Sequence, residues 1–143
     1  MRSLTNDIVV GPYIVKRDRR YTRTDEWAKL SEGNIIIVGI TDYAQKKLRD
    51  IVGVELPEKG RRVSRGEAIA SVESVKAVAD VYSPVTGVVI DVNESLYDEP
   101  ERINRDPYGE GWMFTLKPED LSEFNKLLTP EEYADHIRKR EKI

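Results

Sequence analysis

The stretch ASVESVKAVADVYSP, residues 70–84, contains a single lysine, Lys76, whose amine could carry a covalently attached group. Its neighbours are small and β-branched, a composition typical of strands. If residues 71–75 and 77–81 pair as antiparallel strands, Lys76 lies at or beside a very tight turn that lacks the usual Asn-Gly pair. Two interpretations follow: an ordinary exposed hairpin lysine, or a lysine that a rigid turn presents to an acylating enzyme, with loss of its charge on acylation.

Other residues that could do chemistry are scarce. The chain has no cysteine, so disulfides, thiolate metal sites and a cysteine nucleophile are excluded. The one histidine, His136, lies in YADHIRKREK and is expected to be a solvated helix residue, so neither a metal site nor a Ser-His triad is predicted.

An enzyme active site would have to draw on the acidic residues. The candidates for an acid/base pair are Glu94, Asp98, Glu99, Glu101 and Glu110. They lie in a proline-rich segment with neither a phosphate-binding loop nor a nucleophile motif. We therefore interpret them as a solvated face and predict no catalytic residue.

Length and charge limit the remaining classes. The 143 residues fit one domain, with 39% hydrophobic and 34% charged residues, as in a globular protein with an ionic surface. The net charge of -3 gives no overall attraction to nucleic acid or to an anionic membrane. No signal peptide or membrane span fits the pattern, so a cytoplasmic protein is expected.

The charge is unevenly distributed along the chain. Residues 1–24 contain six basic and two acidic residues, and the remainder is acidic. We predict a basic N-terminal extension or arm at residues 1–20 and a single domain at residues 21–143.

The expected elements follow hydrophobic periodicity and turn residues. In chain order they are a strand pair turned at Gly11-Pro12, a buried strand at 34–41, a short helix near 42–50, a brief strand ended by Pro57, short strands with turns at Gly66 and Gly87, a long surface loop at 94–112, a strand at 112–118 with Trp112, Phe114 and Leu116 on one face, and helices near 119–141. The last helix is expected to begin at Thr129, with Glu132 at the capping-box position. The fold class predicted is mainly β with short helices (α+β), a flattened β-barrel or sandwich.

Several of these segments together resemble a known family. ESVKAVADVYSPVTG resembles the modified-lysine hairpin of lipoyl carrier domains, in particular the H proteins of the glycine cleavage system. YTRTDEW is similar to that family's opening segment, VGITDYAQKKLRD to its first strand and helix, and VELPEKG to its next strand. LYDEPERINRDPYGEGWMFTLKP resembles its acidic loop and closing strand, and LLTPEEY its C-terminal helices. The resemblance covers roughly residues 21–137 in one unbroken order and implies a lipoyl-carrier fold, the barrel-sandwich hybrid.

The resemblance implies roles for particular residues. Lys76 would carry lipoate through an amide, and Glu73 and Ser74 would belong to the shape and charge that the attaching enzyme recognises. The cleft that protects the loaded arm would use Thr24, Glu26 and Asp80, whose oxygens can accept hydrogen bonds from a protonated amine.

One position departs from the family's pattern. Asp25 stands where the family commonly has histidine before EW. This leaves the carrier role intact but puts in doubt a cleft contact made by that histidine. An extra carboxylate there is expected to attract a cationic amine.

The resemblance also implies partners. They are a pyridoxal-phosphate glycine decarboxylase (P protein), a folate-dependent aminomethyltransferase (T protein), dihydrolipoamide dehydrogenase (L protein) and a lipoate ligase or lipoyl transferase. The protein itself would be a non-catalytic carrier and a monomer, with neither nucleic acid nor membrane as a partner.

Three other classes of carrier protein are alternatives to the H-protein interpretation. A biotin carrier is expected to have Met on both sides of the lysine, whereas Val75 and Ala77 stand there. The lipoyl domain of a 2-oxoacid dehydrogenase acyltransferase is usually smaller and followed by an Ala-Pro-rich linker, whereas residues 129–143 read TPEEYADHIRKREKI. A lipoate-relay or regulatory module with an H-like fold stays open, and a test of glycine decarboxylation with partner enzymes separates it from the main reading.

Overall fold

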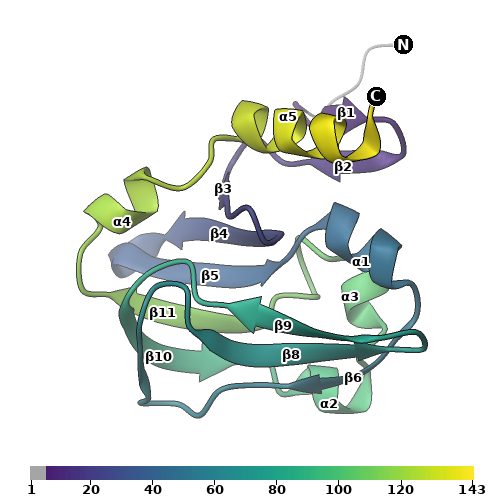
Figure 1. The fold of residues 1–143 in the computed structure, drawn as a ribbon. Helices are drawn as coiled ribbons and strands as arrows, with labels where there is room; N and C mark the ends of the chain where they lie inside the picture. The colour runs from purple at the N-terminus through teal and green to yellow at the C-terminus, as the bar shows by residue number, and fades with distance from the viewer. Residues whose placement is uncertain (1–5) are drawn as a thin grey trace.

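The protein is built mainly of short strands. The computed structural model describes residues 6–143 (Figure 1). The strands are β1 Ile8–Val10, β2 Tyr13–Val15, β3 Arg20–Tyr21, β4 Glu26–Ser31, β5 Ile35–Ile40, β6 Ile51–Glu55, β7 Arg62–Val63, β8 Ala68–Ser74, β9 Val78–Tyr82, β10 Gly87–Val92 and β11 Phe114–Pro118. The helices are α1 Asp42–Leu48, α2 Ser95–Asp98, α3 Arg102–Arg105, α4 Ser122–Asn125 and α5 Pro130–Glu141, with a single 3-10 turn at Glu32–Asn34.

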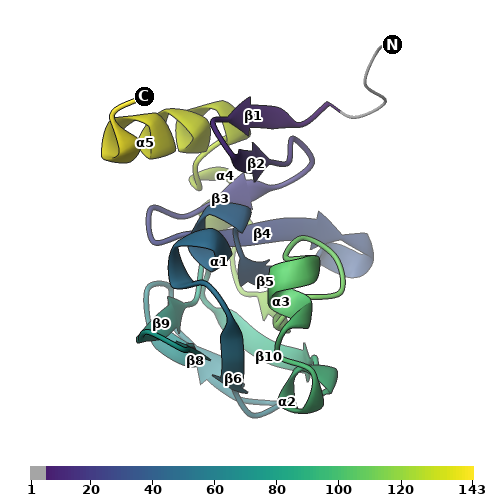
Figure 2. The same cartoon turned by 90° about the vertical axis from the view of Figure 1, so that its right-hand side faces the viewer.

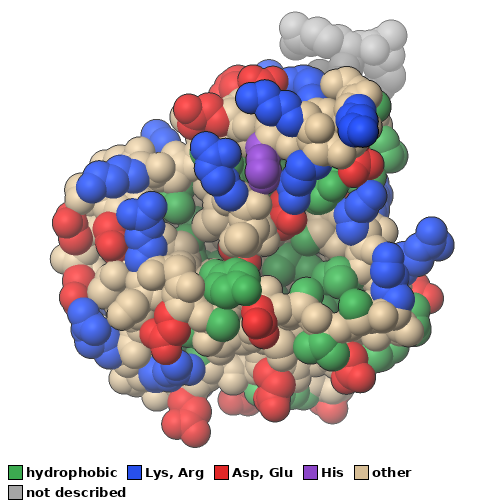
Figure 3. Space-filling view, viewed as in Figure 1, with side chains coloured by type: hydrophobic (Ala, Val, Ile, Leu, Met, Phe, Trp, Pro, Cys, Tyr) green, Lys and Arg blue, Asp and Glu red, His purple; other side chains and the backbone are tan. Residues whose placement is uncertain are grey.

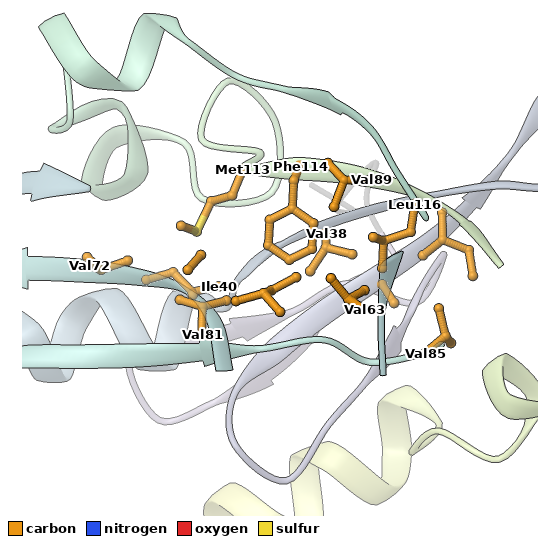
Figure 4. Close-up of a cluster of buried hydrophobic side chains, with 14 of the residues drawn as sticks. Val38, Ile40, Val63, Val72, Val81, Val85, Val89, Met113, Phe114 and Leu116 are labelled. Carbon is orange, nitrogen blue, oxygen red and sulfur yellow. The ribbon is translucent and has the colours of Figure 1, made fainter. Parts of the chain in front are cut away.

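Two antiparallel sheets enclose the main core. One has the strand order β3-β4-β5-β11-β10-β7, and the other has the order β6-β8-β9. Alternate residues of strands such as β5 and β11 point inward, and their apolar side chains meet those of the facing sheet (Figure 4). Val38 and Leu116 of the first sheet and Val72 of the second are fully buried there. The expected class, a β-sandwich with short helices, is confirmed.

A second core lies above the first sheet, around α5. Figure 2 shows α5 beside the β1–β2 hairpin. Val10 and Val15 of this hairpin and Ile137 of α5 are buried in one cluster. The expected strand pair turned at Gly11-Pro12 is thus confirmed, and it is packed against the body of the protein. The first five residues of the predicted arm lie outside the described residues.

The segment from Glu94 to Trp112 differs from the expected long surface loop. It contains the one-turn helices α2 and α3, and Leu96 and Ile103 are fully buried in the main core. Each turn is held by one deeply buried apolar side chain, and burial of such a side chain contributes roughly 1.5–3 kcal/mol. The prediction was wrong because a single helical turn is too short to show a helical period.

The following strand also begins later than expected. Trp112 is only half-buried, whereas the neighbours Met113 and Phe114 are both fully buried. Alternation fails at this point because β11 starts at Phe114, and Met113 belongs to the connection before it.

Helices α1 and α5 both begin at a threonine cap, and the cap of α5 is the one predicted. Thr41 accepts a hydrogen bond from the backbone N–H of Ala44 at the start of α1. At the start of α5, Thr129 and Glu132 form both hydrogen bonds of a capping box. Among residues 6–143, no helix is long and apolar enough to cross a membrane.

Candidate functional site

The turn between β8 and β9 is organised by the side chain of Ser74. The backbone N–H of Ser74 donates to the carbonyl of Ala77 at 2.8 Å. The Ser74 Oγ accepts from the backbone N–H groups of Lys76 and Ala77, each at 3.1 Å. Ser74 is itself buried, because β6 pairs with β8 at this point. A buried hydroxyl therefore satisfies the turn's backbone donors in a sequence without Asn-Gly.

Lys76 stands at the tip of this turn, and its side chain is exposed. Its amine Nζ donates to the backbone carbonyl of Lys47 at 3.2 Å. Lys47 lies in the last turn of α1, where helix carbonyls lack partners within the helix and attract cations. The amine is thus held against the end of α1.

A cleft of about 210 Å³ opens beside that helix end. Figure 3 shows this face hollowed, with hydrophobic side chains gathered in the depression. The cleft is bounded by α1, by the start of β4 and by the β8–β9 hairpin. Its lining residues are Thr24, Asp25, Glu26, Ile40, Tyr43, Ala44, Lys47, Leu48, Val72, Ala79, Asp80 and Val81. A largely apolar hollow with a few oxygen acceptors suits an apolar chain that ends in a cationic amine.

The structure brings Thr24, Glu26 and Asp80 to this one cleft. Glu26 is 1% exposed, and its Oε1 accepts from the hydroxyl of Thr24 at 2.6 Å and from that of Thr22. Its Oε2 accepts from the backbone N–H of Tyr82 at 3.1 Å. Asp80, by contrast, is exposed on β9.

Burial controls the ionisation of Glu26. Loss of solvent raises the pKa of this carboxyl to about 7, although the hydrogen bonds from Thr22, Thr24 and the Tyr82 backbone act in the opposite direction. The carboxyl is therefore close to its titration midpoint at neutral pH and can become charged when a cation approaches.

Glu73 lies apart from the other predicted site residues. It precedes Ser74 on β8, where side chains alternate between the two faces, and its neighbour Val72 lines the cleft. Glu73 is exposed and does not line the cleft. Its carboxylate is accessible from outside on the hairpin that presents Lys76.

The carboxylate of Asp25 is bonded to side chains of the C-terminal helix α5. It has a positive φ of 74° and accepts from the Arg140 guanidinium at 2.6 and 3.1 Å and from the Tyr133 hydroxyl at 2.8 Å. Since Arg140 already neutralises it, the expectation that Asp25 adds attraction for a cationic amine loses its basis.

Sequence reasoning missed the groups that complete the site. Thr22 holds Glu26 from four residues away, and this Thr-x-x-x-Glu spacing at a strand entrance was a usable signal. The Tyr82 N–H and the Lys47 carbonyl belong to the backbone, and they reach the site only through the fold.

Two facing sheets with a lysine at the tip of a tight hairpin define the protein as a carrier of the lipoyl-domain class. The chain belongs to the glycine cleavage H-protein family, whose model matches residues 19–140. Members of this family are lipoyl carriers that act with other components of glycine cleavage.

Individual relatives agree with this assignment. A probable glycine cleavage system H protein of Aeropyrum pernix is 61% identical over 128 residues, covering 90% of this chain and 89% of the relative. The glycine cleavage system H protein of Thermus thermophilus is 54% identical over 121 residues, covering 85% of this chain and 94% of the relative. The crystal structure of a glycine cleavage system H protein from Mycobacterium marinum superimposes with a TM-score of 0.79 at 39% identity, covering 86% of this chain and 98% of that one.

Proposed function

We propose that this protein carries lipoate in amide linkage on Lys76. In this role it receives the aminomethyl group from a pyridoxal-phosphate glycine decarboxylase and delivers it to a folate-dependent aminomethyltransferase. Dihydrolipoamide dehydrogenase then oxidises the two thiols of the lipoyl group back to their disulfide. The protein catalyses none of these steps. The observation that carries the proposal is the position of the Lys76 amine, 3.2 Å from the Lys47 carbonyl at the edge of the acid-lined cleft.

The residues present fit this cofactor. The lipoyl group supplies the sulfur that a chain without cysteine lacks. Lys76 is exposed on a turn whose backbone is held by Ser74, so an attaching enzyme can reach the amine without unfolding the hairpin. Acylation removes the charge of Lys76, and an attached arm then brings no cation of its own to the carboxylates of the cleft.

The cleft residues have separate tasks in protecting a protonated amine. Glu26 accepts it at a site screened from water, where an ionic hydrogen bond is strongest. Thr24, already bonded to the same carboxylate, offers a hydroxyl beside it. Asp80 is exposed and attracts the amine from the outer side of the cleft. Apolar residues such as Ile40 and Val81 exclude water and thereby slow hydrolysis of the cargo.

The test of the attachment site is the intact mass after incubation with lipoate and a lipoate ligase, followed by peptide mapping. We expect a gain of one lipoyl group on wild type and on Lys59→Arg, a matched change at another exposed lysine, and no gain on Lys76→Arg. Modification of Lys76→Arg, or none of the folded wild type, would refute the assignment.

A second assay addresses the partner system. The lipoylated protein is combined with glycine decarboxylase, and release of carbon dioxide from glycine is followed. We expect release that depends on both the protein and its lipoyl group. A lipoylated protein that supports no release is a relay or regulatory module instead.

A further inference from the structure

A second pocket, of about 260 Å³, adjoins the cleft and shares Thr24 and Glu26 with it. Its rim carries three exposed cations from distant parts of the chain. Arg23 comes from the segment before β4, Arg65 from the connection between β7 and β8, and Lys126 from the segment after α4. We call this hollow the basic pocket.

The charges of the basic pocket are uncompensated. Among residues 6–143, Arg23, Arg65 and Lys126 form no ion pair. Their neighbours behave differently, since Arg61 pairs with Glu67 and Arg62 with Glu119. Three unpaired cations around one hollow make a local positive potential on a chain of net charge -3.

The acids nearby do not cancel this potential. Glu26 is the one acidic side chain that lines the described pocket, and it is 1% exposed, whereas the three cations stand exposed at the surface. Lys126 lowers the pKa of Asp120, although less than the hydrogen bonds from Ser122 do, and Asp120 does not line the pocket. An incoming anion therefore meets three exposed cations, none of which forms an ion pair among residues 6–143.

We propose that the basic pocket docks a carboxylate-bearing segment of the enzyme that takes the cargo from the cleft. This rests on the proposed function for the identity of the enzyme. Charge complementarity is the basis of the assignment, because three exposed cations on three elements match several carboxylates of a protein surface. Since the basic pocket and the cleft share Thr24 and Glu26, a segment anchored in one places its enzyme over the other.

The charges of the basic pocket also direct the cationic cargo and the anionic partner segment to different hollows. A protonated amine is repelled by Arg23, Arg65 and Lys126 and is attracted by Asp80 on the cleft side. The cationic cargo therefore enters the cleft, and the anionic partner segment enters the basic pocket. Opposite charge preferences in adjacent hollows give specificity through repulsion as well as attraction.

The test measures the dissociation constant between the lipoylated protein and the aminomethyltransferase, at low and at high salt. Arg65→Glu and Lys126→Glu should each weaken binding about tenfold at low salt, and high salt should reduce the difference, as expected for exposed charges. The matched control is Lys139→Glu on α5, another exposed lysine without an ion pair among the described residues. Its effect should stay within about twofold. Equal effects of the three variants would overturn the inference.

Two further measurements distinguish a failure of the docking proposal from a failure of the proposed function. Each variant is first checked by mass for lipoyl attachment at Lys76, so that normal attachment with unchanged binding refutes the docking site and leaves the proposed function standing. A hexaglutamate peptide should then compete with the enzyme for wild type and should not compete for Arg65→Glu. Competition by inorganic phosphate at equal concentration and ionic strength would identify a small-anion site and overturn the docking assignment.

Discussion

The amine nitrogen of Lys76 lies 3.2 Å from the backbone carbonyl oxygen of Lys47, a residue 29 positions earlier in the chain. Lys47 also lines the cleft. A group attached to Lys76 therefore starts at the edge of the cleft that we propose as its shelter. Glu26 lies in the same hollow and is the acceptor whose chemistry depends most on burial.

Replacement of Glu26 by Gln should change how stability depends on pH. The unfolded carboxyl titrates near its ordinary pKa of 4.5, whereas burial raises the folded pKa to about 7. Between these values the folded state keeps a proton that the unfolded state has released, so the free energy of unfolding falls as pH rises and is level above pH 7. A shift of this size corresponds to about 3 kcal/mol.

The measurement is denaturant unfolding of wild type and Glu26→Gln at pH 4 and pH 8. Wild type should lose about 3 kcal/mol relative to the variant over this interval. Glu67→Gln, at an exposed carboxylate whose pKa is lowered, mainly by the Ser64 backbone N–H, serves as the control with the opposite sign. A difference between wild type and Glu26→Gln that stays constant with pH would contradict the raised pKa.

The ion pair between Asp25 and Arg140 should stabilise the attachment of α5. Both side chains are partly buried, at 18% and 32% exposure, and the guanidinium contacts the carboxylate through two nitrogens. A double-mutant cycle with Asp25→Asn and Arg140→Gln should give a coupling of about 1 kcal/mol. The more exposed pair Asp135 and Arg138 is the control and should give less than about 0.5 kcal/mol. Equal couplings would show that burial adds nothing to the pair.

Features that depend on residues close together in the chain were predictable from the sequence. The capping box of α5 is decided by Thr129 and Glu132, three residues apart, and the buried strand β5 is one continuous apolar run. The helices α2 and α3 were not predictable, because each is one turn held by a single residue, Leu96 or Ile103, and that residue's burial is decided by the two sheets.

The site residues also differ in whether the sequence could predict their roles. Lys76 could be singled out from its own segment, since a lone cation interrupts a strand-like run. The state of Glu26 could not, because it depends on the backbone N–H of Tyr82, 56 residues away, and on burial by both sheets. Asp25 likewise looked like a free acid until α5 brought Arg140 to it, 115 residues later.

The N-terminal hairpin should matter for stability and not for the modification that we propose at Lys76. Val15 is fully buried against α5, whereas Val9 is 64% exposed. Val15→Ala should lower the free energy of unfolding by about 2 kcal/mol, and the matched Val9→Ala should change it by less than about 0.5 kcal/mol. Both variants should accept lipoate at the wild-type rate, because Lys76 lies on the β8–β9 turn of the β6-β8-β9 sheet, whereas both valines lie in the separate β1-β2 sheet. Slower attachment in Val15→Ala alone would show that the hairpin acts on the carrier site.

Ser74 should set how readily Lys76 is modified. In Ser74→Ala the turn loses the buried oxygen that accepts from the backbone N–H groups of Lys76 and Ala77, at 3.1 Å each. Unsatisfied donors cost about 1–3 kcal/mol, so the tip should loosen, and lipoyl attachment, followed by mass over time, should slow several-fold while still being confined to Lys76. Ser71→Ala is the control, because this half-buried serine lies on the same strand, three residues before Ser74. If both variants are modified at the wild-type rate, the attaching enzyme needs only an exposed lysine, and the ordered turn has its role at a later step.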